Sequence, residues 1–352
     1  MKRIVQLVVS LSITAVCFWW TFRHTNWGEM LLSLRTARWW LMLPYIGVLF
    51  GIHFARTIRW GALLSGIEKV KFGPLNEASA IGFMMLLVLP FRLGEFARPF
   101  LIAERSTIRR SAAMTTVVLE RIVDGIVIAV LLRVLLLFVP DSANSMGIVT
   151  AGANIMFAVF GSGFVFLLVA RWQHDRTVRA LRAVFGLVSP RVAEKVVYIV
   201  DGFVGALKQL PDAKNFAVFI LATAAYWVLN GWGMSLFASA FDGVDQLTFF
   251  QGYVVLSVLV CGLMIPAAPG SAGTFHAAIT LALGLFLPAD VVNGPGIAYA
   301  NVLWLVQMAQ QILFGLFIMV LSKRSFGDLA GKLSDGPPTE PPNGGDKLKA
   351  QA

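Results

Sequence analysis

Long apolar stretches dominate this chain, and polar residues fall in short intervals between them. An α-helix needs about 20 apolar residues to cross the hydrocarbon core of a bilayer, and several stretches approach that length. We predict full spans at residues 4–22, 39–55, 111–132, 149–170, 216–237 and 296–321. The pattern therefore predicts an all-α polytopic membrane protein with about six full spans.

Two further apolar regions are interrupted by proline and glycine. Residues 75–89 run into an interval that contains Pro90, Gly94 and Pro99, and residues 249–265 run into a Pro/Gly-rich interval at 266–276. Broken backbone at membrane depth is tolerated only where it is buried in protein or lines a wet cavity. We expect two re-entrant hairpins, a first hairpin at 75–103 and a second hairpin at 249–287. Eight simple spans remain the alternative.

Charge along the chain sets the expected orientation, because cytoplasmic loops carry an excess of Lys and Arg. The basic residues that define the cytoplasmic side are Lys2, Arg3, Lys69, Lys71, Arg105, Arg109, Arg110, Lys323 and Arg324. Asp242, Asp245 and the acidic interval 288–295 fit the opposite side. The first hairpin then enters from the cytoplasm and the second from outside. Basic residues in the external loop or surface helix at 24–38 fit this orientation least well.

The two halves of the chain follow one plan. Residues 1–140 and 147–321 each read as two spans, a Pro/Gly-broken hairpin and one span. Three crossings per half place the second half upside down relative to the first. Inverted repeats with broken helices at matching positions are typical of transporters, which bind substrate at the repeat interface.

The integral membrane domain is expected to cover residues 1–321 and to contain one cytoplasmic segment, and a tail follows it. Residues 171–214 are basic, and Ser189-Pro190 favours a helix start. Its apolar stripe consists of Val192, Val196, Ile199, Val200, Phe203, Leu207 and Leu210, so we expect a cytoplasmic amphipathic segment. Residues 322–352 are polar and rich in Pro and Gly, which predicts a largely disordered cytoplasmic tail.

Composition excludes other classes of protein. Of 352 residues, 57% are hydrophobic and 14% are charged, whereas soluble domains are about 25% charged. The net charge of +10 would suggest nucleic acid for a soluble protein. In a membrane protein it follows from the cytoplasmic excess of basic residues and from attraction to anionic lipid. We expect the bilayer and a lipid with an anionic head group as partners, with envelope-biosynthesis proteins as further candidates and no nucleic acid.

Charged side chains inside the first hairpin make it a candidate binding site. Arg92, Glu95 and Arg98 sit where the backbone is interrupted, and guanidinium groups pair bidentately with phosphate. Within the span at 111–132, Glu120, Arg121 and Asp124 are expected to form a structural charge network, with an Arg121–Asp124 pair on one helix. The alternative for the hairpin residues is a buried ion network that contacts no substrate.

The second hairpin offers backbone amides instead of cations. Gly270, Ser271 and Gly273 can present N–H groups to an anion at a helix start, and His276 can hydrogen-bond a head group or be structural. The Gly-Lys-Ser/Thr of a nucleotide loop is absent, as are a metal-ligand spacing and the Gly-x-Ser-x-Gly of a hydrolase. We therefore expect no metal, no cofactor and no enzymatic activity.

Three sequence patterns together resemble a known family. They are Pro90-x-Arg92-x-Gly94-Glu95-x-x-Arg98, Glu120-Arg121-x-x-Asp124, and Pro266-x-x-Pro269-Gly270-x-x-Gly273. The chain resembles the membrane domain of lysylphosphatidylglycerol synthases, a flippase-like family, over nearly its whole length to about residue 321. Phe275-His276 stands where family members often carry a glutamate, which leaves head-group specificity open. The resemblance implies a stand-alone member without the aminoacyl-transferase domain, and some such relatives are associated with hopanoid-lipid biosynthesis.

The resemblance implies lipid translocation in a bacterial inner membrane, and the basic residues near the chain ends predict that both termini are cytoplasmic. The first hypothesis is thus a flippase that moves a phospholipid or a lipid-linked envelope intermediate between leaflets. The second is a non-transporting accessory subunit of an envelope lipid or glycan pathway. The third is a membrane-embedded lipid-modifying transferase, for which only residues 171–214 would be available as a cytoplasmic domain.

Overall fold

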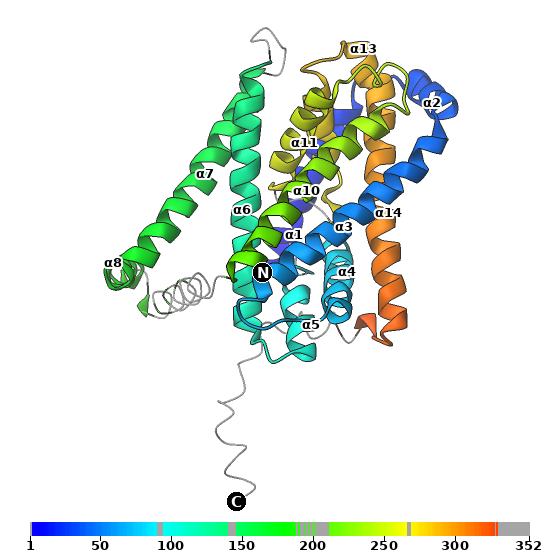
Figure 1. The fold of residues 1–352 in the computed structure, drawn as a ribbon. Coiled ribbons are helices and arrows are strands. Elements are labelled where there is room, and N and C mark those ends of the chain that lie inside the picture. Colours follow the sequence, from blue (N-terminus) through cyan, green and yellow to red (C-terminus); the bar gives the residue numbers. More distant parts are fainter. Residues whose placement is uncertain are drawn as a thin grey trace, which may run out of the picture.

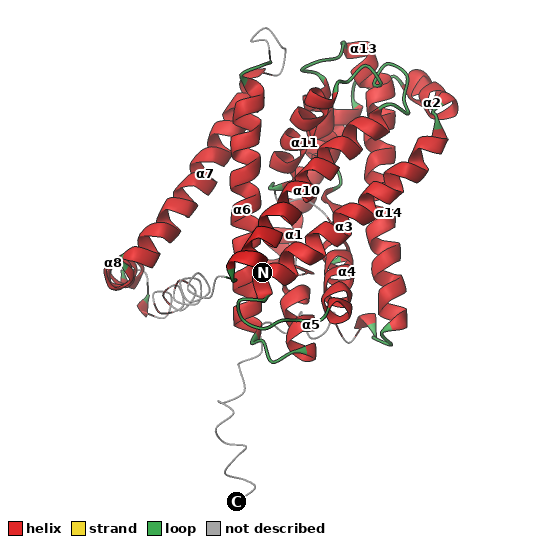
Figure 2. Cartoon of the chain, in the orientation of Figure 1, coloured by secondary structure: helices red, strands yellow, loops and turns green. Residues whose placement is uncertain are grey.

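The computed structural model describes residues 2–89, 94–139, 146–187, 189–190, 194, 197, 200, 211–265, 269–327 and 329. Helices make up the described part of the chain, joined by short loops and turns, and no strand occurs in it (Figure 2). Most helices stand side by side in one bundle, and α5 and α2 mark its two opposite ends (Figure 1). We refer to these as the α5 end and the α2 end.

The first half of the chain supplies one surface helix, two broken-hairpin arms and three longer helices. In chain order its helices are α1 (Lys2–Phe22), α2 (Trp27–Thr36), α3 (Met42–Leu64), α4 (Phe72–Val88), α5 (Ala97–Arg105) and α6 (Arg110–Leu136). A short 3-10 turn, η1 (Trp39–Leu41), leads into α3. The predicted surface segment at 24–38 is therefore largely helix α2, which begins at the N-cap Asn26.

The second half begins with a long helix that leans away from the rest of the bundle (Figure 1). Its elements are α7 (Met146–Trp172), α8 (His174–Gly186), α10 (Ala213–Ala238), α11 (Phe249–Leu263), η3 (Pro269–Ser271), α12 (Thr274–Leu283), α13 (Ala289–Val291), η4 (Val292–Gly296) and α14 (Ile297–Leu321). Most of the expected amphipathic stripe between α8 and α10 lies outside the described residues, as does the tail beyond residue 329.

Four helices among the described residues are long and apolar enough to cross a membrane. They are Trp39–Leu64, Met146–Phe166, Ala213–Ala238 and Ala289–Leu321. Helix α6 has 27 residues and is also long enough, but its central charges keep it out of this set. The described part of the chain is thus helical, as expected for a polytopic membrane protein. All six predicted spans fall on helical residues, and four of the helices concerned have both the length and the hydropathy of a membrane span.

Helices α4 and α5 pack against each other where the first hairpin was predicted. The open ends of the pair lie together at the α5 end, since Arg324 contacts both Glu77 near the start of α4 and Glu104 near the end of α5. Gly94 precedes α5 and lies directly against α4, where a Cβ atom would come within 2.0 Å of the Leu86 backbone nitrogen. Only glycine permits this close approach of two backbones.

Helices α11 and α12 also pack against each other, with their open ends toward the α2 end. The backbone between them turns through Gly270 (φ 69°) and Gly273 (φ 85°), a conformation that favours glycine. Gly273 contacts α1, where a Cβ would lie 2.8 Å from the carbonyl oxygen of Thr14. The two broken elements therefore open toward opposite ends of the bundle.

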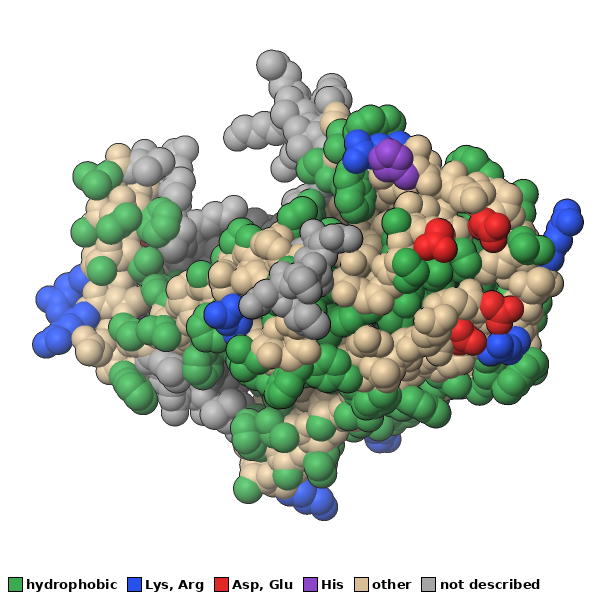
Figure 3. Space-filling view, turned by 90° about the horizontal axis from the view of Figure 1, so that it is seen from above, with side chains coloured by type: hydrophobic (Ala, Val, Ile, Leu, Met, Phe, Trp, Pro, Cys, Tyr) green, Lys and Arg blue, Asp and Glu red, His purple; other side chains and the backbone are tan. Residues whose placement is uncertain are grey.

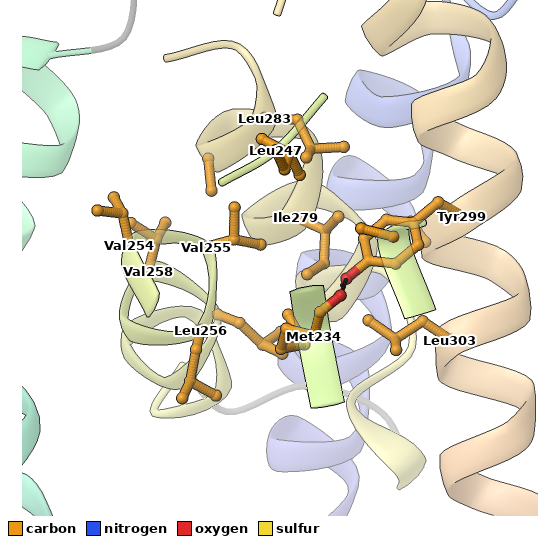
Figure 4. Packing of buried hydrophobic residues seen from close by; sticks show 14 of the residues in the cluster. Met234, Leu247, Val254, Val255, Leu256, Val258, Ile279, Leu283, Tyr299 and Leu303 are labelled. Atoms are coloured by element: carbon orange, nitrogen blue, oxygen red, sulfur yellow. Dashed lines mark hydrogen bonds between the residues drawn. The ribbon is translucent and has the colours of Figure 1, made fainter. Parts of the chain in front are cut away.

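The largest apolar core lies where helices of both halves meet. Helix α3 packs along α10, and Tyr45 stacks on Phe237 at a ring separation of 4.6 Å. Figure 4 shows the part of this core between α10, α11, α12 and α14, where the Tyr299 hydroxyl donates to the Met234 carbonyl at 3.1 Å. The buried hydroxyl has a partner, so the core carries no penalty for it.

Ion pairs tie the two halves together at each end of the bundle. At the α2 end, Arg38 donates to Asp242 at 2.8 Å and to Asp245 at 3.4 Å. Acidic side chains gather on the α2 side of this face (Figure 3). These contacts pair Arg38, which lies just before α3, with acidic residues of the second half of the chain. At the α5 end, Arg324 makes the corresponding link to the first hairpin, with Glu104 at 2.6 Å.

Candidate functional site

Six charged residues meet inside the bundle, between α3, α5 and α6. We call Arg56, Arg59, Arg98, Glu120, Arg121 and Asp124 the arginine cluster. Glu120 is the tenth residue after the first residue of α6, roughly 15 Å along the helix from its start at the α5 end. The cluster therefore lies well inside the length of the helices that surround it.

Arg59 is fully engaged with carboxylates. Its Nε and Nη2 atoms donate to Glu120 Oε1 at 2.9 and 2.6 Å, and its Nη1 and Nη2 atoms donate to Asp124 at 2.5 and 3.0 Å. The side chains of Arg59 and Glu120 are each only 2% exposed. Buried charges of this kind are stable only when they are paired and hydrogen-bonded. This triad fixes α3 against α6.

Arg98 reaches the same carboxylate from α5. Its Nη1 atom donates to Glu120 Oε2 at 2.9 Å, and its guanidinium lies over the ring of Trp60 at 4.3 Å. Gly82 of α4 makes room for it, because a Cβ there would lie 2.3 Å from the Arg98 Cγ. Its Nε and Nη2 atoms are buried and have no hydrogen-bond partner among the described residues. One complete two-donor edge of the guanidinium is thus unused.

Arg56 and Arg121 add positive charge without adding an ion pair among the described residues. The Arg56 guanidinium lies 3.5 Å from the centre of the Phe83 ring, and Arg98 lies 4.7 Å from the same ring. The Arg121 Nε atom is buried and has no hydrogen-bond partner in the described part of the chain. The arginine cluster therefore contains four guanidinium groups and two carboxylates, and among the described residues the carboxylates are contacted by Arg59 and Arg98.

This geometry corrects one expected contact and adds residues that the sequence analysis missed. Asp124 pairs with Arg59 and not with Arg121, because the acidic face of α6 turns toward α3. The predicted span at 39–55 ends just before Arg56 and Arg59. Helix α3 instead continues to Leu64 and carries both into the bundle. Their spacing of three residues put them on one helical face, a signal that could have grouped them.

The other predicted residues of the first hairpin lie near its turn. Arg92 lies outside the described residues. Glu95 is half-buried in the short 3-10 turn at 94–96 that precedes α5. Of the three charged residues proposed for the first hairpin, Arg98 is the one whose contacts with the arginine cluster the structure describes.

The predicted residues of the second hairpin form a separate group. Gly270 accepts a hydrogen bond from Trp304 Nε1 at 2.8 Å through its carbonyl, and Ser271 adopts a positive φ of 52°. His276 is buried, and its ring lies 5.5 Å from Phe18 and 5.6 Å from Trp304. Gly273 marks the start of α12 and packs on α1, as described above. The Nδ1 atom of His276 is buried and has no hydrogen-bond partner among the described residues.

A polar contact lies between the arginine cluster and the α5 end of the bundle. A surface pocket there is lined by residues of α4, α5 and α14 together with Ser322: Gly73, Pro74, Asn76, Glu77, Arg105, Ile318, Leu321 and Ser322. The Asn76 side chain lies 2.9 Å from His53 Nε2, and His53 stands one helical turn from Arg56 on α3. The described residues contain no group of three or more metal-ligating side chains.

Comparison with known proteins places the chain in one family. No curated protein matches it, and no solved structure matches it. The family model described as the lysylphosphatidylglycerol synthase TM region matches residues 4–315, which includes every helix of the arginine cluster. The hopanoid association stays a prediction. The chain therefore belongs to the family of lysylphosphatidylglycerol synthase transmembrane regions.

Proposed function

We propose that this membrane protein binds the anionic head group of a lipid at the arginine cluster and moves the lipid between the leaflets. The observation that carries the proposal is the unused Nε/Nη2 edge of Arg98, which is buried among further guanidinium groups. Two adjacent N–H donors match two oxygens of a phosphate, and such bidentate contacts are the strong ones. Family membership supports a role in lipid-related processes.

The movement would come from the two hairpins. In this proposal α4–α5 and α11–α12 are re-entrant, and the two halves are inverted repeats around the bound head group. The Arg98 edge is closed to solvent in the described conformation, so a ligand reaches it only after the first hairpin shifts. The pocket beside Asn76 and the His53 contact suggest a path from the α5 end to the arginine cluster. We place that end, with both termini, in the cytoplasm of a bacterial cell.

Flipping by the purified chain tests the proposal. Liposomes that contain fluorescent phosphatidylglycerol are mixed with a membrane-impermeant quencher, and the quenched fraction reports the lipid that crosses. We expect the wild type to expose inner-leaflet lipid. Arg98→Lys should move lipid more slowly, because an ammonium group cannot form the bidentate contact. Arg92→Ala belongs to the same panel, since Arg92 is the other cation predicted for this site.

Arg56→Gln separates an effect on lipid binding from an effect on folding better than Arg98→Lys does, because Arg56 makes no ion pair among the described residues. It should slow flipping and keep the thermal melt of the wild type. Arg133→Gln, an exposed arginine on α6, is the matched control and should leave flipping unchanged. A folded wild type that moves no lipid would refute transport and favour the accessory-subunit hypothesis. We propose no catalytic step for this chain.

A further inference from the structure

The charges of the arginine cluster do not balance. Arg56, Arg59, Arg98 and Arg121 accompany Glu120 and Asp124, so these six residues carry an excess of two positive charges. Arginine cannot lose its proton in a protein, so the excess is not removed by titration. Arg59 donates to Glu120 and to Asp124, and Glu120 also accepts from Arg98. The excess charge therefore belongs to Arg56, Arg121 and the free edge of Arg98.

Contacts with aromatic rings offset only part of this excess. Arg56 lies over Phe83, and Arg98 lies over Trp60 and Phe83. Arg98 is almost fully buried, whereas Arg56 and Arg121 are half-buried. A ring contact is weak compared with the cost of removing a charge from water, because a ring quadrupole supplies no counter-charge. Two uncompensated cations inside a membrane bundle are a functional feature by default. They indicate a ligand that brings the missing negative charge.

We infer that this ligand is a lipid whose head group is a phosphate monoester with two negative charges. The inference rests on the proposed function and names the class of lipid. A dianionic phosphate would neutralise the excess, and two of its oxygens would match the Nε/Nη2 edge of Arg98. A phosphodiester lipid brings one charge and leaves one cation unpaired. An aminoacylated phospholipid brings an additional cation into the same site.

The positions of the guanidinium groups support one shared anion. The guanidinium carbons of Arg56 and Arg98 both lie within 5 Å of the centre of the Phe83 ring. The Nε atom of Arg121, on α6, is buried and has no hydrogen-bond partner among the described residues. A monoester phosphate has three terminal oxygens, enough for contacts with all three arginines, whereas a diester has two. Free phosphate offers the same chemistry, so the test must separate it from a lipid.

Binding to the purified full chain in nanodiscs of zwitterionic lipid tests the inference. The probes are dioctanoyl phosphatidate, dioctanoyl phosphatidylglycerol, lysyl-phosphatidylglycerol and inorganic phosphate. Titrations at about pH 8.5 lie well above the second ionisation of a phosphate monoester, near pH 6. We expect phosphatidate to bind about tenfold more tightly than phosphatidylglycerol, since one more charge acts at close range. Inorganic phosphate should bind weakly.

Variants test whether the charge count sets this preference. Arg56→Gln should reduce the preference for phosphatidate to about twofold or less, Arg56→Lys should retain it, and the control Arg133→Gln should leave it unchanged. Equal or tighter binding of phosphatidylglycerol or its lysyl ester would overturn the inference. So would a preference that survives Arg56→Gln. Inorganic phosphate that binds as tightly as phosphatidate would make free phosphate the ligand and overturn the lipid class.

Flipping of fluorescent phosphatidylglycerol and of fluorescent phosphatidate, measured in liposomes with the same purified protein, separates this inference from the proposed function. If phosphatidylglycerol crosses the bilayer and phosphatidate is not preferred, transport stands and the dianionic class is wrong. If phosphatidate is preferred and no lipid crosses, the head-group class stands and transport is wrong.

Discussion

Glu120→Gln tests whether one carboxylate holds three helices together. Glu120 on α6 accepts two hydrogen bonds from Arg59 of α3 and one from Arg98 of α5. Glutamine keeps the shape of the side chain but removes its negative charge. Its amide NH2 group would also face guanidinium donors. The variant therefore leaves the positive charges of the cluster with Asp124 as their partner among the described residues.

The free-energy cost of Glu120→Gln follows from the burial of the ion pairs that Glu120 makes. Removing one partner of a fully buried ion pair costs about 3–5 kcal/mol, because an uncompensated charge stays behind. Asp124→Asn should cost less, about 1–3 kcal/mol, because Arg59 keeps its contacts with Glu120. A protein is typically stable by only about 5–15 kcal/mol, so Glu120→Gln would remove a large part of the folding free energy. We expect a low yield and a markedly lower melting temperature.

The assay is unfolding in mixed micelles of mild detergent and sodium dodecyl sulfate, followed by the fluorescence of the ten tryptophans. Arg59→Met and the double variant with Glu120→Gln complete a cycle, in which the double variant should cost less than the sum of the single changes. A Glu120→Gln protein within about 0.5 kcal/mol of the wild type would refute the reasoning, since surface changes have effects of that size.

Three further changes test other features of the fold. Gly94→Ala should prevent the first hairpin from closing and strongly lower the folded yield. The control Gly73→Ala, where a Cβ meets nothing within 4 Å, should fold normally. A normal folded yield of Gly94→Ala would contradict the close contact. Arg324→Gln should lower the free energy of unfolding by about 1–2 kcal/mol, an effect that 1 M salt should not abolish because the pairs are mostly buried. Cysteines at Gly73 and Thr107 should both react with an impermeant maleimide from the cytoplasm, and reaction from opposite sides would rule out a re-entrant first hairpin.

Local sequence predicted the positions of the helices better than their contacts. The interval predicted at 216–237 is helix Ala213–Ala238, and the interval at 111–132 is helix Arg110–Leu136. Proline and glycine marked both breaks, because these residues change the backbone locally. The ends of spans were predicted less well where charged residues lie inside the bundle. Helix α3 carries Arg56 and Arg59 and continues to Leu64, beyond the predicted end at residue 55.

The partner of Glu120 could not be predicted from the sequence. Arg59 is 61 positions away on another helix, and nothing in the local pattern encodes that contact. The prediction of an Arg121–Asp124 pair used helical spacing alone, and tertiary packing overrode it. Arg98 was predicted as a site residue because cations and broken backbone coincide in its segment. The Nε/Nη2 edge of Arg98 that has no partner could not be predicted, because it depends on how Gly82 and Trp60 of other helices pack around this side chain.

The paired charges of α6 also bear on how the chain enters the membrane during synthesis. An isolated α6 would carry Glu120, Arg121 and Asp124 into hydrocarbon, at about 2.5–3.5 kcal/mol for a charged residue near the helix centre. Its partners Arg59 and Arg98 lie earlier in the chain, so the ribosome has already delivered them when α6 emerges. Helix α6 is therefore expected to leave the translocon against α3 and the first hairpin. A chain that lacks those segments would retain α6 poorly in the bilayer.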